Sequence, residues 1–160
     1  MQEIMPISQT GHEKLKEELS QLELEAVQVR QRVAEARAHG DLKENGEFIY
    51  GRQQLGFIEG RLGEIRGKLN YSKVVDCTQV PCDRVAFGTV VTLLDLETQT
   101  RTVYQLLGPY DADIADDTIS ILSPIGDALL GLAVGDKVSV SVPRGLLHFE
   151  LLEIATSNMK

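Results

Sequence analysis

Two runs of equal length carry apolar residues at heptad spacing: LKEELSQLELEAVQVRQRVAEA at residues 15–36 and FIYGRQQLGFIEGRLGEIRGKL at residues 48–69. In both runs these residues recur in alternating steps of three and four, with Gly51 as the one gap in the apolar series. Such spacing places one apolar stripe along each of two α-helices. We therefore expect the two stripes to pack against each other.

The segment between the runs predicts that the two helices form an antiparallel hairpin. Gly40 follows the first run, and glycine favours the left-handed backbone that ends many helices. Because the stripes have equal length and mirrored step order, Leu15 is expected opposite Leu69 and Ala36 opposite Phe48.

The ends and the interior of the helices carry further signals. Thr10 and Glu13 have the spacing of a capping box, which predicts that the first helix begins at Gly11. The second helix contains many glycines, each costing about 0.8–1 kcal/mol relative to alanine, so the hairpin is expected to be only modestly stable. These glycines are Gly46, Gly51, Gly56, Gly60, Gly63 and Gly67.

Composition excludes several classes of protein. The chain has 160 residues and a net charge of −8, of which residues 76–160 carry nearly all, and this argues against a stand-alone DNA-binding protein. No apolar run approaches the length of a membrane span, and we expect no secretory signal and no membrane partner. Cys77 and Cys82 are too isolated for a zinc site or a disulfide framework, so a reducing cytoplasm is expected.

The turn AHGDLKENGE at residues 38–47 allows two interpretations of Asp41 and Glu44. In the first, Asp41 is the N-cap of the second helix and Glu44 completes a capping box, and the pattern alone favours this interpretation. In the second, the two carboxylates are Mg²⁺ ligands on one side of the tip, forming an incomplete site that a partner completes. The interpretations are compatible because a capping carboxylate keeps unused lone pairs.

The second half predicts a small antiparallel sheet with one short helix. Ser123 as N-cap, Pro124 in the first turn and Gly131 as terminator delimit the helix. Residues 71–84 are expected to be a linker. The expected strands span residues 85–94, 101–107, 118–122, 137–142 and 147–154.

Several motifs resemble the Gre family of bacterial transcript cleavage factors. They are GDLKENGEF at residues 40–48, QQLGFIEGRL at 53–62, FGTVVTLLDL at 87–96 and SPIGDALLGLAVGDKVSVSVPRG at 123–145. The resemblance implies an α+β protein, with an antiparallel coiled-coil hairpin at residues 1–75 and an FKBP-like domain at 76–160. It covers nearly the whole chain in the same order.

The resemblance also implies a function and a set of site residues. A monomer would insert its hairpin into the secondary channel of bacterial RNA polymerase and stimulate cleavage of the nascent RNA at its backtracked 3′ end. Asp41 and Glu44 match the family's tip acids, which share Mg²⁺ with the polymerase active site, so the chain alone would not be an enzyme. Ser123 and Pro124 match the loop that docks on the channel rim. Arg52 follows Phe48 by one helical turn, and its position allows two interpretations: a contact with extruded RNA, or a solvated helix charge.

Some residues depart from the family pattern. Gly46 and Phe48 stand where alanine and tyrosine are common, and Leu122 stands where some relatives carry aspartate. The few basic residues of the second helix favour the A-type branch, which acts on short backtracks. Two alternatives remain: a channel regulator without cleavage activity, and a peptidyl-prolyl isomerase or chaperone, which the few aromatic residues of the second half disfavour.

Overall fold

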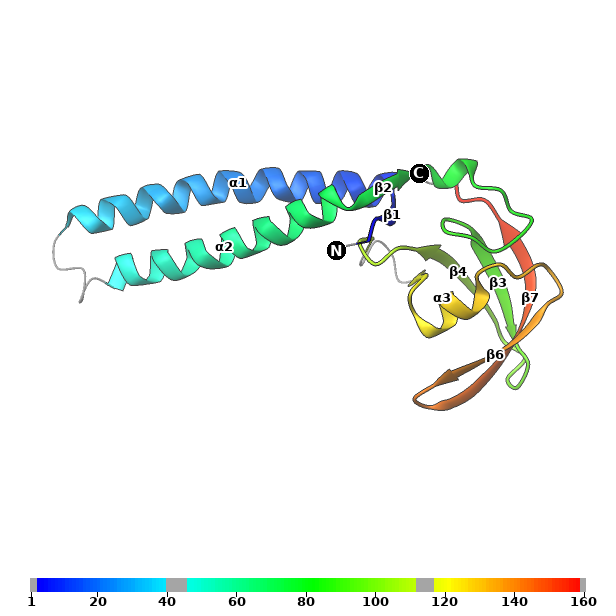
Figure 1. Cartoon of the computed structure of the whole chain (residues 1–160). Coiled ribbons are helices and arrows are strands. Elements are labelled where there is room, and N and C mark those ends of the chain that lie inside the picture. Colours follow the sequence, from blue (N-terminus) through cyan, green and yellow to red (C-terminus); the bar gives the residue numbers. More distant parts are fainter. Residues whose placement is uncertain (1–2, 40–45, 112–116, 159–160) are drawn as a thin grey trace. The chain divides into compact units, whose positions relative to one another are not determined.

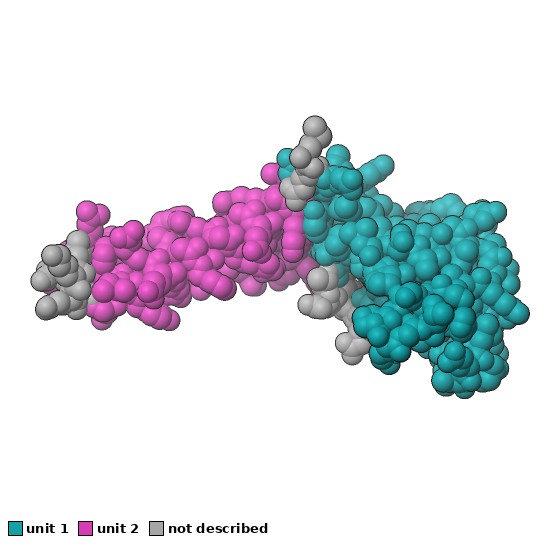
Figure 2. Space-filling view, turned by 60° about the horizontal axis from the view of Figure 1, so that its bottom comes forward, with its two compact units in different colours: residues 1–12, 71–160 teal, residues 13–70 magenta. Residues whose placement is uncertain are grey.

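The computed structural model describes residues 3–39, 46–111 and 117–158 (Figure 1). The chain divides into two compact units, coloured separately in Figure 2. Unit 1 comprises residues 1–12 and 71–160, and unit 2 comprises residues 13–70. Asp41 and Glu44 lie outside the described residues.

Unit 2 is a pair of long helices, α1 (Gln9–Ala38, whose first turn belongs to unit 1) and α2 (Gly46–Asn70), which lie side by side. The core of the pair is made by residues of the two predicted stripes. The buried cluster is Ala26, Val29, Ile58 and Leu62, flanked by Leu19, Leu22, Val33 and Leu55. The heptad pattern thus predicted the buried faces of both helices.

Ion pairs link the two helices along the hairpin and agree with the antiparallel arrangement. Arg61 Nη2 lies 2.9 Å from Glu18 Oε1, and the hydrogen bonds that Arg61 donates, first to Glu18 and then to Glu64, raise its pKa above the ordinary value. Two longer pairs also join the helices, Arg66–Glu23 at 3.5 Å and Arg30–Glu59 at 3.4 Å. Pairs this exposed contribute little stability each, so the apolar seam dominates.

The start of α1 differs from the predicted capping box. The helix begins at Gln9, and Ser8 is its cap because Gly11 N donates a hydrogen bond of 3.0 Å to Ser8 Oγ. Ser8 ends a short strand, β1 (Met5–Ser8), which pairs in parallel with β2 (Ser72–Val75).

The segment predicted as a linker therefore holds regular structure. Residues 71–84 contain β2 and a short 3₁₀ helix, η1 (Cys77–Gln79), which Asp76 caps. The pairing of β1 with β2 groups the first residues of the chain with unit 1, whereas the sequence pattern assigned all of residues 1–75 to the hairpin domain. Neither strand is long enough to show a clear alternation, so no sequence pattern predicts the pair.

Unit 1 is built on a five-stranded sheet of order β5-β4-β3-β7-β6. The strands are β3 (Val90–Asp95), β4 (Arg101–Leu107), β5 (Thr118–Ser120), β6 (Lys137–Val142) and β7 (Gly145–Ala155). All five predicted strands are present. The sheet is mixed rather than wholly antiparallel, because β5 pairs in parallel with β4.

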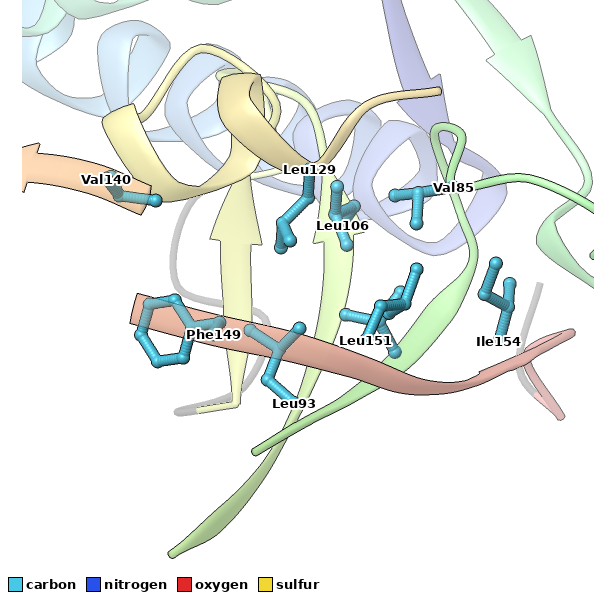
Figure 3. Close-up of a cluster of buried hydrophobic side chains, with 9 residues drawn as sticks. Val85, Leu93, Leu106, Leu129, Val140, Phe149, Leu151 and Ile154 are labelled. Atoms are coloured by element: carbon cyan, nitrogen blue, oxygen red, sulfur yellow. The ribbon is translucent and has the colours of Figure 1, made fainter. Parts of the chain in front are cut away.

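One face of this sheet carries the core of unit 1. Leu129 of the short helix α3 (Pro124–Leu129) lies against Leu106, Leu151 and other buried side chains of the sheet (Figure 3). Two aromatic residues of the second half are used in this core: Phe149 is buried, and Tyr104 packs against the cluster. Both side chains therefore contribute to the interior of unit 1.

Candidate functional site

The segment that carries the two predicted metal ligands connects α1 to α2. Ala38 is the last residue of α1 and Gly46 the first of α2, while Asp41 and Glu44 lie between them, outside the described residues. Within residues 3–39, 46–111 and 117–158, the acidic, histidine and cysteine side chains form no group of three that could hold a metal ion. The assignment of Mg²⁺ to Asp41 and Glu44 stays a prediction.

Arg52 lies on α2, one turn after Phe48. Its guanidinium carbon stands 5.7 Å from the centroid of the Phe48 ring, which is cation–π distance. No carboxylate within the described part of the chain forms an ion pair with Arg52, in contrast to Arg61 and Arg66 of the same helix. The side chain is exposed and held over the ring, so its charge remains available to an anion.

A cavity of about 320 Å³ opens between the two helices near the same end of the hairpin. Its buried walls are Val29, Ala36 and Gly51. Its rim is formed by the half-buried Gln54 and by five exposed residues: Arg32, Glu35, His39, Glu47 and Tyr50. No sequence pattern predicted this cavity. The only related observation was that Gly51, which lines it, interrupts the apolar series of the second helix.

The predicted docking residues lie at the start of α3. Ser123 Oγ accepts a hydrogen bond of 3.1 Å from Gly126 N and donates one of 2.6 Å to Ser120 O, so this hydroxyl caps the helix as predicted. Pro124 is the first helical residue and is exposed. Leu122, one of the departures from the family pattern, exposes 60% of its surface next to them. The turn thus presents an apolar surface beside a rigid cap.

Unit 1 contains a buried carboxylate, which no sequence pattern had marked as a site residue. Asp111 is only 3% exposed, and its two oxygens accept hydrogen bonds from Ser8 and Gly108. Its charge also acts on Cys77: burial first, and then the charges of Asp111 and Asp76, raise the pKa of this thiol from 9.0 to about 11. Cys77 is buried and Cys82 exposed, and both are free thiols in the structure.

In the part of the chain that the structure describes, no helix is long and apolar enough to cross a bilayer.

Comparison with known proteins identifies relatives along the whole chain. Residues 5–74 match the family described as transcription elongation factor, N-terminal, and residues 80–156 match transcription elongation factor, GreA/GreB, C-term. Transcription elongation factor GreA of Desulfotalea psychrophila is 45% identical over 155 residues, which is 96% of each chain. GreA of Thermodesulfovibrio yellowstonii is 40% identical, over 97% of this chain and 99% of its own.

Among solved structures, GreA factor homolog 1 of Thermus thermophilus is similar at 25% identity, covering 96% of this chain and 99% of its own with a TM-score of 0.45. The sequence matches confirm the resemblance inferred from the motifs, in both halves and in the same order. The chain therefore belongs to the GreA/GreB family and is a transcription elongation factor of the Gre type.

Proposed function

We propose that this protein rescues backtracked or arrested bacterial RNA polymerase in the cytoplasm. Its hairpin enters the secondary channel and stimulates the polymerase's own Mg²⁺-dependent cleavage of nascent RNA. The observation that carries the proposal is a pair of carboxylates in the connection between two antiparallel helices, in a chain that belongs to the GreA/GreB family. At 1.5 Å per residue, the 30 residues of α1 span about 45 Å, which is long enough to reach a recessed site.

The two carboxylates supply only part of a metal site. Mg²⁺ in proteins is commonly held by one or two carboxylates together with waters and phosphate oxygens, so Asp41 and Glu44 fit the role of partial ligands. When bound there, Mg²⁺ would activate a water molecule or stabilise the charge that develops on the leaving oxygen. The hairpin's contribution is to carry two negative charges to the reacting phosphodiester. This protein alone would then have no nuclease activity.

The RNA contact is assigned to Arg52. Because its guanidinium is exposed and is not engaged by a carboxylate of the described residues, it can pair with a phosphate of RNA extruded past the 3′ end. Arg61 and Arg66 of the same helix are bound to glutamates of α1. A single contact of this kind suits short backtracks, as in the A-type branch.

Docking on the rim of the channel is assigned to the turn of Ser123 and Pro124. The capped start of α3 holds this turn rigid, and the exposed Leu122 extends it with an apolar side chain. Where some relatives offer an aspartate, this protein would make an apolar contact. The docking surface of its polymerase is then expected to be less basic at that point.

The central experiment measures RNA cleavage in reconstituted backtracked complexes of a bacterial RNA polymerase. Asp41→Asn and Glu44→Gln keep the size of each side chain and remove its charge. Each variant should reduce the cleavage rate by at least about tenfold, and the double variant should abolish stimulation, because metal binding by the tip is lost. Glu35→Gln, an exposed acid on α1, is the matched control and should leave the rate unchanged.

Binding is measured in the same complexes by competition with labelled wild-type protein, and it should survive the tip substitutions. Full cleavage by the double variant would leave Asp41 and Glu44 with a capping role only. If the wild-type protein slows elongation and stimulates no cleavage, the channel regulator is the correct alternative. Catalysis of prolyl isomerisation in a peptide assay would support the FKBP-like alternative instead.

A further inference from the structure

The cavity of about 320 Å³ lies where the seam between the two helices is made of small residues. Ala36 of α1 and Gly51 of α2 line it, and both are buried, whereas the packed cluster of the same seam contains Ile58 and Leu62. A methyl group and a missing side chain leave space that larger residues would fill. Every lining residue lies between positions 29 and 54, so the cavity belongs to unit 2 alone.

The rim of the cavity combines several kinds of polar group. On α2, Glu47, Tyr50 and Gln54 follow one another in steps of three and four, so they share one face of the helix. Arg32 lines the cavity from α1. An apolar floor is thus surrounded by a phenol ring, a carboxamide and charges of both signs.

Two of these charges are available to a ligand. Among residues 3–39, 46–111 and 117–158, neither Arg32 nor Glu47 forms an ion pair. Glu35 on the same rim differs, because it accepts a hydrogen bond of 3.4 Å from Gln31 Nε2. Opposite charges at one rim disfavour a strongly anionic or strongly cationic ligand in the cavity. They favour a neutral molecule that carries both hydrogen-bond donors and acceptors.

We propose that this cavity binds one unpaired nucleobase, with guanine preferred. A base is flat and neutral, and its faces can stack on the Tyr50 ring and on the planar guanidinium of Arg32. Guanine presents two neighbouring N–H donors on its Watson–Crick edge, which suit the two acceptor oxygens of Glu47. Gln54 can both donate and accept, so it can pair with the remaining polar groups of the base.

The volume of the cavity agrees with a ligand of this size. At about 320 Å³ it lies at the lower end of the range of small-molecule sites, roughly 300–1,000 Å³. Two sources present such a base: a free guanine nucleotide, and the extruded 3′ end of the nascent RNA. The second source rests on the proposed function, in which the hairpin meets backtracked RNA. Arg52, to which the other RNA contact is assigned, does not line this cavity.

The first measurement uses the free protein with the 5′-monophosphates of guanosine, adenosine, cytidine and uridine as probes. Guanosine monophosphate should give the strongest saturation-transfer NMR signal and should shift the backbone amide resonances of Ala36 and Gly51, which line the cavity. A single stacked base binds weakly, so probe concentrations up to about 10 mM are used. Inosine monophosphate lacks only the 2-amino group of guanine and should bind more weakly.

Variants of the rim test the assigned contacts. Tyr50→Ala should weaken the binding of guanosine monophosphate at least about fivefold, which is the loss expected for one stacked base, whereas Tyr50→Phe should bind like the parent protein. Glu47→Gln should reduce the preference for guanosine over adenosine monophosphate, because one acceptor oxygen is lost. Phe57→Ala is the matched control, since Phe57 is also an exposed aromatic residue of α2 but does not line the cavity. It should leave binding unchanged.

The cleavage assay then separates the two sources of the base. The substrates are backtracked complexes that extrude a single nucleotide, either G or U. If RNA supplies the base, Tyr50→Ala should slow cleavage of the complex ending in G about fivefold and slow cleavage of the other less. Rates equal to those of the parent protein on both substrates would assign the cavity to a free guanine nucleotide. Phe57→Ala should leave both rates unchanged.

Two outcomes would overturn the proposal. One is the absence of both saturation transfer and a shift at Gly51 with all of the monophosphates. The other is a loss of binding in Phe57→Ala as large as that in Tyr50→Ala, because the base would then lie on the aromatic surface of α2 and not in the cavity. Absence of cleavage with the wild-type protein would instead refute the proposed function and leave the binding result on the free protein standing.

Discussion

Gly51 of α2 meets Val33 of α1 so closely that a Cβ atom placed on Gly51 would lie 2.8 Å from Val33 Cγ2. Valine is stiff about its first side-chain torsion, so it cannot turn aside without strain. Gly51→Ala should therefore lower the stability of the hairpin by about 1 kcal/mol, because overpacking outweighs the better helix propensity of alanine. The check is chemical denaturation followed by circular dichroism at a helical wavelength, where an increased midpoint would contradict the close approach.

The other glycines of α2 lead to the opposite prediction. A Cβ atom at Gly60 or Gly63 would meet nothing within 4 Å, and both residues are exposed. Gly60→Ala and Gly63→Ala should each raise the stability of the hairpin by about 0.8–1 kcal/mol through helix propensity alone. The same denaturation experiment measures both variants. A loss of stability at either site would mean that the glycine is needed for a contact absent from the isolated protein.

The hairpin was predictable because its register is repeated in many residues. The contact between Val33 and Gly51 has the same register as the predicted pairing of Leu15 with Leu69. One heptad pattern therefore predicts the pairing of α1 with α2 along the hairpin. Strands of the second half were likewise found from alternation and turn residues, and Ser123 was correctly identified as the cap of α3. Each of these signals is local in the sequence.

What could not be predicted depends on contacts between distant residues. Either Ser8 or Thr10 is a plausible cap for α1, and the structure selects Ser8 through Asp111, a residue 103 positions away. The parallel pairings of β1 with β2 and of β4 with β5 could not be predicted either, because the connection between parallel strands leaves no turn signature in the sequence. The roles of Asp41 and Glu44 stay predictions, because the local pattern favours a cap but is also compatible with a metal ligand.

The buried thiol of Cys77 predicts a loss of stability at high pH. Burial, and then the charges of Asp111 and Asp76, raise its pKa from 9.0 to about 11 in the folded protein. The thiol's contribution is fully present below pH 9.0 and is lost as the pH rises to about 11, since the unfolded chain ionises first. Lysine and tyrosine side chains also titrate there, so the quantity to compare is the difference between the parent protein and Cys77→Ala.

That difference should shrink between pH 8.5 and pH 11 in denaturation experiments on a Cys82→Ser background, as ionisation of the unfolded thiol removes the advantage of the parent protein. A thiol-reactive probe gives an independent reading: Cys82 should react quickly at pH 8, whereas Cys77 should react only on unfolding. A constant difference across this range would show that Cys77 is not shielded as the structure indicates.

Arg52 lies over Phe48 on α2, and we predict that it contacts only RNA that is extruded past the 3′ end. Arg52→Ala should weaken cleavage of complexes with extruded RNA by a factor of about three to ten, which is the range of one charge-assisted contact. Cleavage should be less affected when the backtrack is a single nucleotide, because less RNA is available to reach the guanidinium. Phe48→Leu should have a smaller effect in the same direction, since it removes the ring that holds the charge in place.

Arg66→Ala is the matched control, because Arg66 lies on the same helix but is bound to Glu23. It should leave cleavage of both substrates unchanged and cost the hairpin less than about 1 kcal/mol, as expected for an exposed ion pair. Crosslinking from the RNA 3′ segment to the hairpin provides the direct reading. If Arg52→Ala and Arg66→Ala behave alike on both substrates, the charge of Arg52 is a solvated helix charge, and the contact with extruded RNA must be made elsewhere.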